Sequence, residues 1–302
     1  MKKALIQLHA AVFLWGFTGV LGRLISLNEG LLVWYRMIIT IVTLYIIMRR
    51  ENSLQSVPPK QRNQLLGIGI LIALHWCFFY GSIKYSNVSI ALTCLSSAGL
   101  FTSVFEPLLF RKRIVLIEVL LGTISLVGIW LIFHFDPQYK TGIILGVTCT
   151  VLSCLFSILN KKQVAHTPPK TVMLYELTGG LAFLTLVMPL YLYYLPTKHL
   201  LPQKLDIVWL LIMAWFCTVL SWHLSLQALT KVSAFTQGLT LNLEPVYGII
   251  LAFVVYHENE YLSKWFYLGF ALILVAVFLQ MLRITRGGRR AIVHETNEVF
   301  LT

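Results

Sequence analysis

Apolar stretches about the length of a membrane span recur from one end of the 302-residue sequence to the other. A helix of about 20 residues crosses the hydrocarbon core of a bilayer, and a soluble domain could not cover so much apolar surface. The sequence therefore predicts an all-α integral membrane protein with ten transmembrane helices. The ten runs are 4–22, 30–48, 66–84, 88–110, 114–133, 141–160, 171–194, 206–226, 232–256 and 261–282.

The charged residues are few but mostly basic, with 24 lysines and arginines against 12 acidic residues. A surplus of this kind is compatible with nucleic-acid binding, but its placement argues against it. If Lys2 and Lys3 lie inside, most of the basic residues fall in loops and tails on that same side, as Arg49, Arg50 and the 111–113 run do. This positive-inside pattern predicts a multi-pass protein of a bacterial inner (plasma) membrane with both termini cytoplasmic.

The two halves of the chain echo each other at three dipeptides, which occur in the same order and in matching runs. Because a repeat of five helices is odd, its second copy enters the membrane from the opposite side. Secondary transporters often have such inverted repeats, with the substrate site between them near the midplane. We expect repeats at 1–136 and 137–283, then a loosely ordered polar cytoplasmic tail at 284–302. The pairs are Tyr35-Arg36 with Tyr175-Glu176, Val88-Ser89 with Val232-Ser233, and Leu121-Gly122 with Leu268-Gly269.

Several short motifs carry a family resemblance: Leu14-Trp15-Gly16, Trp34-Tyr35-Arg36 and Leu243-Glu244-Pro245-Val246. With the ten runs and the charge pattern, the chain resembles the drug/metabolite transporter superfamily, and within it the EamA family. The resemblance implies two EamA-like repeats and alternating-access transport of small metabolites, often the export of amino acids or drug-like compounds. The 111–113 run, Arg-Lys-Arg, stands where that family has Gly-Glu, while His257-Glu258 matches it with one change.

The ninth run carries most of its polar side chains on one face. On a helical wheel, Gln237, Thr240, Glu244 and Tyr247 fall within about 80° of arc. A polar stripe on a membrane helix must face protein or water, so we predict that these four residues line a cavity for substrate or coupling ion. For the small hydroxyl side chains, close helix packing is an equal alternative.

Glu244 is the only charged residue well inside the ninth run, and a proline follows it. A buried carboxyl group can exchange a proton, pair with Arg36 or bind a substrate amine; a structural hydrogen bond is the alternative. Pro245 cannot donate a hydrogen bond to the preceding turn and bends the helix. With Gly238 and Gly248 on either side, it predicts a hinge, against the alternative of a fixed kink.

Arg36 and several aromatic residues complete the predicted site. Arg36 can bind a substrate carboxylate through its planar fork, or extend to the membrane interface. His75, Trp76, Trp222 and Trp15 can form the walls of a pocket, although a hydrogen-bonded structural role is the alternative for His75. We expect Glu176, near Lys170, to pair with basic residues of the loops.

The sequence contains no catalytic or metal-binding motif, and its five cysteines lie inside the runs without CxxC spacing. We therefore predict no catalytic residue, metal site or cofactor. The expected function is a monomeric secondary transporter in the lipid bilayer with a small-molecule substrate, with protons as the candidate coupling ion and no nucleic-acid partner. The alternatives are a transporter of nucleotide sugars or lipid-linked substrates, and a membrane-embedded sensor or enzyme.

Overall fold

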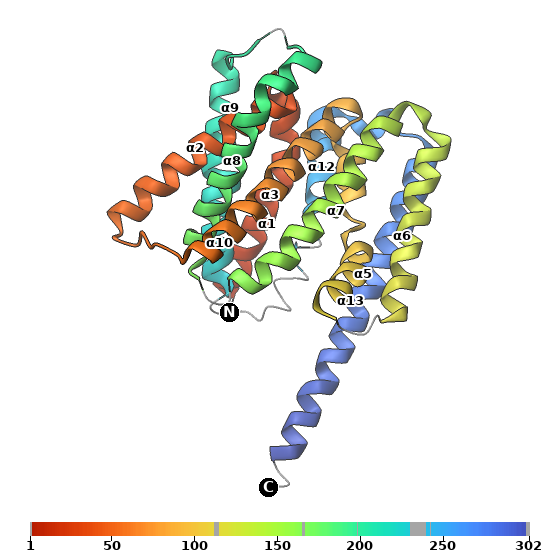
Figure 1. The fold of residues 1–302 in the computed structure, drawn as a ribbon. Coiled ribbons are helices and arrows are strands. Elements are labelled where there is room, and N and C mark those ends of the chain that lie inside the picture. The colour runs from red at the N-terminus through yellow and green to blue at the C-terminus, as the bar shows by residue number, and fades with distance from the viewer. Residues whose placement is uncertain are drawn as a thin grey trace.

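The computed structural model describes residues 2–111, 115–164, 167–197, 199–229, 240–241 and 243–299, without the side chains of 161, 162, 226, 229 and 284–299. This part of the chain is helical with no strands (Figure 1). Nine of its helical segments are long and apolar enough to span a membrane. The remaining expected span, the ninth run, overlaps the undescribed residues, and its main described part is a shorter apolar helix.

The helices follow the expected runs closely, with two irregularities. The fourth run is interrupted at Ser96 and Ser97, and the eighth contains a π-helical segment. In chain order the elements are α1 (Lys2–Leu24), α2 (Glu29–Arg50), α3 (Pro59–Tyr85), α4 (Val88–Leu95), α5 (Ala98–Phe110), α6 (Leu116–Phe135), the 3-10 helix η1 (Pro137–Tyr139), α7 (Lys140–Gln163), α8 (Pro169–Tyr194), α9 (Lys204–Ala214), the π-helix η2 (Trp215–Leu220), α10 (Ser221–Leu229), α12 (Glu244–Tyr256), the 3-10 helix η3 (Glu258–Glu260) and α13 (Lys264–Val299).

The C-terminal segment differs from the expectation. The sequence predicts a loosely ordered tail after the tenth run, but α13 continues as one helix to Val299 (Figure 1). The segment 284–299 has two adjacent glycines but no proline, so no residue in it lacks the backbone N–H that an α-helix needs.

The helix packing has an internal symmetry. α1 packs on α12 and α10, and α7 packs in the same way on α5 and α3. α3 packs on α8 as α9 packs on α2, while α6 packs on its own counterpart α13. If α1 to α6 are matched in order with α7 to α13, these contacts exchange with one another. The packing therefore supports two matching sets of helices.

α5 and α12 give the register of this match. Both helices have 13 residues, and both end at a residue in the left-handed conformation, Arg111 and His257, each with φ of 52°. Matching the two ends places Ala98, the first residue of α5, opposite Glu244, the first residue of α12. The first set of helices thus has a small apolar residue where the second has a carboxyl group.

The crossing of α1 and α12 depends on glycine. A Cβ atom on Gly16 would lie 2.9 Å from the carbonyl oxygen of Glu244, and one on Gly248 would lie 2.9 Å from the carbonyl oxygen of Gly16. No larger residue fits at either position without shifting a backbone. This contact holds the start of α12, and with it Glu244, directly against α1.

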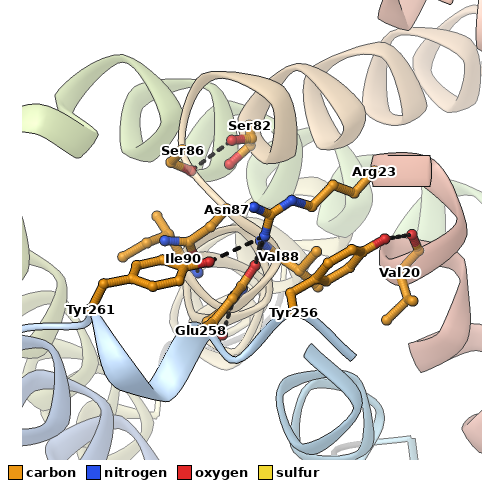
Figure 2. A network of polar contacts seen from close by, with 11 residues as sticks. Val20, Arg23, Ser82, Ser86, Asn87, Val88, Ile90, Tyr256, Glu258 and Tyr261 are labelled. Atoms are coloured by element: carbon orange, nitrogen blue, oxygen red, sulfur yellow. Dashed lines mark hydrogen bonds and ion pairs between the residues drawn. The ribbon is translucent and has the colours of Figure 1, made fainter. Parts of the chain in front are cut away.

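An ion-pair network around the buried carboxylate of Glu258 joins several elements, as Figure 2 shows in close view. The fully buried carboxylate of Glu258 accepts hydrogen bonds from the Arg23 guanidinium at 2.5 Å and from the backbone N–H groups of Val88 and Ser89 at 3.1 and 2.8 Å. The Ser89 hydroxyl donates a fourth bond at 2.5 Å. Glu258 therefore neutralises the positive N-terminus of α4 and joins it to α1 and η3. Arg23 also lies over the ring of Tyr256, 4.3 Å from its centroid.

Candidate functional site

A cavity of about 320 Å³ lies between the two sets of helices. This volume is within the range of small-molecule binding sites. Its polar and charged lining residues come from seven different helical elements, so no single segment forms it. The sequence-predicted residues that line it are Trp15, Arg36, His75, Trp76, Trp222 and Glu244; further lining residues include Thr18, Asn160, Glu176, Thr218, Phe79 and Phe156.

A second cavity, of about 400 Å³, is larger but is lined mostly by apolar side chains. Its acidic and basic lining residues are Glu51 and Lys170, and these pair with each other at 2.6 Å. The remaining lining is mostly aliphatic and aromatic, and Trp222 lies between the two cavities. The smaller cavity is the better candidate site because its charged groups are not paired with one another.

Arg36 is buried in this cavity with a 4% exposed fraction. Its Nε and one Nη donate to the Thr218 hydroxyl at 3.2 and 2.8 Å, and its other Nη donates to the Tyr80 hydroxyl at 2.5 Å. The guanidinium also lies 4.0 Å from the centroid of the Trp76 ring. Among the described residues, no carboxylate forms a salt bridge with it. Arg36 is thus a rigidly held buried cation without a counter-ion among the described residues.

Thr218 owes its position to the π-helical segment η2. Its hydroxyl donates to the carbonyl oxygen of Met213 at 3.0 Å, five residues back, and so presents a lone pair to Arg36. Short π-helical segments inside α-helices are frequent at functional sites, because the extra residue redirects side chains. Here it turns Thr218 and Trp222 toward the cavity.

Glu176 lies in the same cavity and not among the loop cations. Lys170, its expected partner, pairs with Glu51 instead, because α8 carries Glu176 almost two turns deeper into the bundle. Glu176 is 4% exposed, and Asn160 is its side-chain hydrogen-bond partner. Glu176 Oε1 and Asn160 Oδ1 are both buried acceptors without a partner. The expectation for Glu176 was therefore wrong.

Glu244 occupies the first position of α12, and its carboxyl has no hydrogen-bond or ion-pair partner among the described residues. Pro245 follows in the first turn, where the missing N–H costs no helical hydrogen bond. The ninth run is therefore interrupted immediately before Glu244, since Leu243 forms a turn. By the match of α5 with α12, this interruption corresponds to the Ser96–Ser97 break before α5.

His75 is held by the backbone. Its Nδ1 lies 2.9 Å from the carbonyl oxygen of Cys149, so Nδ1 carries the proton and Nε2 is the acceptor. Its ring stacks on Phe79 and meets Phe156 edge to face. His75 and Phe79 thus form part of an aromatic wall together with Trp15, Trp76 and Trp222.

The other predicted residues that the structure describes do not line the cavity. Tyr247 bonds to the ring nitrogen of His9 at 2.8 Å and packs against Phe13, because one further helical step of three residues turns it about 60° from Glu244. Thr240 is buried but is not a lining residue. Gly248 serves the crossing with α1 described above. Gln237 and Gly238 lie outside the described residues, so the hinge stays a prediction.

The comparisons with known proteins agree with this architecture. The sequence model of the EamA-like transporter family matches residues 2–134 and again residues 140–282. The chain belongs to this family. Its two matches coincide with the two sets of helices.

Two transporters without an assigned substrate are similar in sequence to this EamA-like protein. An uncharacterized transporter of Haemophilus influenzae is 24% identical over 168 residues, which are 52% of this chain and 55% of that protein. The chain thus spans about half the length of that relative. The uncharacterized transporter YetK of Bacillus subtilis is 25% identical over 300 residues, covering 93% of this chain and 87% of YetK. The family and both relatives indicate a multi-pass membrane transporter.

A solved crystal structure has the same fold. It aligns over 95% of this EamA-like chain and 99% of its own length, with a TM-score of 0.62 and 17% sequence identity. At this identity the likeness shows the fold alone.

Only some residues of the site can be recognised from the sequence. Thr218, Tyr80 and Asn160 carry no local signal, because each is a common residue inside an apolar run. Glu176 does carry one, since it follows a tyrosine as Arg36 does in the matching run. Across the described residues, no group of three histidine, cysteine or acidic side chains could hold a metal ion.

Proposed function

We propose that this protein is a secondary transporter that exports a small zwitterionic metabolite, an amino acid or a related compound, by alternating access. The observation that carries the proposal is Arg36, a buried cation in the central cavity whose counter-ion the described protein does not supply. Isolated buried charges are costly, so a site of this kind is suited to a ligand that brings the opposite charge. A carboxylate fits the planar guanidinium best.

The rest of the cavity supports a zwitterion over an anion. Two carboxyl groups, those of Glu176 and Glu244, line it beside the single arginine. A nucleotide sugar or a lipid-linked pyrophosphate carries several negative charges and would meet repulsion from both. The aromatic wall suits the organic side chain of a metabolite.

The proposed mechanism uses the two sets of helices as inverted repeats of a ten-span monomer. In a bacterial inner membrane with both termini cytoplasmic, the Glu258 network lies at the outer end. The cavity reaches Val164 and Val172, which lie near the cytoplasmic ends of α7 and α8. The arrangement thus suits a form closed outside and reached from inside. The interruptions before α5 and α12 are at matching places, as in transporters whose broken helices frame the substrate site.

Glu244 is the proposed coupling residue. Its carboxyl lines the cavity without a partner among the described residues and has no counterpart in the first repeat, where Ala98 stands. A group in that position can take up a proton in one orientation of the transporter and release it in the other. Proton uptake from outside would then drive substrate export.

Flux through purified protein in proteoliposomes tests this function. Radiolabelled phenylalanine or leucine is loaded inside or outside the vesicles, and uptake is followed with and without an imposed pH gradient. We expect wild-type flux to follow the gradient, and Glu244→Gln to lose at least about tenfold or to become independent of pH. Glu260→Gln, an exposed glutamate in η3, is the matched control. Unaltered, pH-dependent flux in Glu244→Gln would refute coupling through Glu244.

A further inference from the structure

We infer that Arg36 and Glu176 are the two charged halves of one substrate site, Arg36 for a carboxylate and Glu176 with Asn160 for an ammonium group. This inference rests on the proposed function and deepens it. It assigns the substrate class, an α-amino acid or similar zwitterion, to two particular side chains. It also separates the substrate carboxyl, Glu176, from the coupling carboxyl, Glu244.

The two residues occupy equivalent places in the fold. Arg36 lies seven residues after Glu29, the first residue of α2, and Glu176 lies seven residues after Pro169, the first residue of α8. α2 and α8 are counterparts that also pack on each other. The two positions are thus equivalent in the two sets of helices, and both side chains line the same cavity with equal burial and opposite charge.

Glu176 and Asn160 each have one oxygen that accepts no hydrogen bond from the described residues. Glu176 Oε1 and Asn160 Oδ1 are buried acceptors without a partner, and both residues line the cavity. An unpaired buried acceptor costs about 1–3 kcal/mol, so two beside each other are not expected in a purely structural pair. An ammonium group has three N–H donors and a positive charge, and it would satisfy both oxygens at once. A neutral hydroxyl has one donor and would satisfy only one.

Arg36 does not use all of its N–H donors in hydrogen bonds with Thr218 and Tyr80. A guanidinium carries five N–H groups, and Arg36 uses three of them on Thr218 and Tyr80. The bonds in use leave one free N–H on each Nη atom. These two N–H groups are the donors that Arg36 can offer to the oxygens of a carboxylate. Tyr80, Thr218 and the Trp76 ring hold the guanidinium in place beforehand, which lowers the cost of binding.

The backbone around Glu176 is equally fixed. A Cβ atom on Gly69 of α3 would lie within 2 Å of the Glu176 carbonyl oxygen, so α3 and α8 are in direct backbone contact there. The Glu176 backbone cannot move away from α3 without separating these two helices. The hydrogen bond with Asn160 holds the carboxyl itself.

A matched series of ligands tests the assignment. Phenylalanine has both charges, 3-phenylpropanoate has only the carboxylate, and 2-phenylethylamine has only the ammonium group. Their affinities for the purified full-length protein are measured by isothermal titration calorimetry. Leucine, 4-methylpentanoate and 3-methylbutylamine form a second series for an aliphatic side chain. The variants are Glu176→Gln, Asn160→Leu and Arg36→Gln, with Glu260→Gln as control.

The expected result is a pattern and not a general loss. Glu176→Gln weakens phenylalanine and 2-phenylethylamine by at least about tenfold and leaves 3-phenylpropanoate within about twofold. Asn160→Leu acts in the same direction and less strongly. Arg36→Gln gives the reverse pattern. If Arg36→Gln does not fold, the pattern in Glu176→Gln decides alone.

The measurements distinguish a failure of the substrate-site assignment from a failure of the proposed transport function. If Glu176→Gln weakens phenylalanine and 3-phenylpropanoate equally, or leaves all three ligands unchanged, Glu176 is structural and the substrate-site assignment is wrong, while the proposed transport function stands. If wild-type protein binds neither phenylalanine nor leucine, the proposed function itself fails. Wild-type binding with an ammonium-selective loss in Glu176→Gln supports both.

Discussion

Glu258 and Glu176 are both buried glutamates of the second half of the chain, but their surroundings are opposite. Glu258 accepts four hydrogen bonds from a guanidinium, two backbone N–H groups and a hydroxyl. Glu176 has Asn160 as its partner and one oxygen with none. The two arginines differ in the same way, since Arg23 is bonded to Glu258 while Arg36 has no described counter-ion.

The difference separates a carboxylate whose acceptors are filled within the protein from one that keeps an unfilled acceptor among the described residues. A carboxylate whose acceptors are all filled within the protein contributes to folding and has nothing left to offer. A buried charged group with unused donors or acceptors destabilises the empty protein and is a candidate for function. Burial alone does not distinguish the two cases; the count of satisfied partners does.

The strongest test of this contrast removes the Glu258 carboxylate. Glu258→Ala leaves two N–H groups at the start of α4 and the Arg23 guanidinium without their acceptor, so we expect the free energy of unfolding to fall by about 3–5 kcal/mol. Thermal or denaturant unfolding in detergent measures it. Glu260→Ala, two residues along and exposed, should change stability by less than about 0.5 kcal/mol. Equal shifts in the two variants would contradict a structural role for the network.

The cavity carboxyls should behave in the opposite way. Glu176→Gln and Glu244→Gln keep the side-chain shape and remove groups that lack strong partners, so each should alter the free energy of unfolding by less than about 1 kcal/mol. The same unfolding assay measures this, and circular dichroism confirms unchanged helix content. A loss comparable to that of Glu258→Ala would show that the cavity glutamates also hold the fold together.

The smallest effect belongs to the exposed pair of Glu51 and Lys170. The Lys170 ammonium donates to Glu51 at 2.6 Å and lowers the pKa of that carboxyl below its usual value of 4.5. The pair's stabilisation is thus complete above about pH 4.5 and is lost as the pH falls through the lower pKa of the folded protein. Glu51→Gln should lower Tm only slightly at neutral pH, and the difference should shrink with acid or with high salt. A large difference that persists in acid would contradict a simple surface pair.

Much of the architecture was predictable because membrane spans leave a strong local signal. Apolar runs of helical length must form helices in lipid, since no water is present to satisfy the backbone. The runs therefore predicted the helices α1 to α10 and the start of α13 to within three residues, except that α3 begins at Pro59, seven residues before its run. The continuation of α13 to Val299 was missed because a polar helix beyond the membrane leaves no apolar signal.

The site was predictable only in part. Arg36, Trp15, Trp76 and Glu244 were recognisable because charged and aromatic side chains inside a span are unusual. Tyr247 was placed with them by helical periodicity, yet its hydroxyl bonds to His9 on α1. Periodicity gives a direction around one helix axis but not the position of the neighbouring helix.

By itself, the sequence determined that this chain is a helical membrane protein built from two related halves, because hydropathy, charge bias and repeated motifs act locally along the chain. Only the tertiary structure decided which charges are paired. Glu258 meets Arg23 across 235 positions, and Glu176 is carried away from Lys170 into a cavity shared with Arg36. Pairing depends on distances between side chains on different helices, and those distances exist only after the helices have packed.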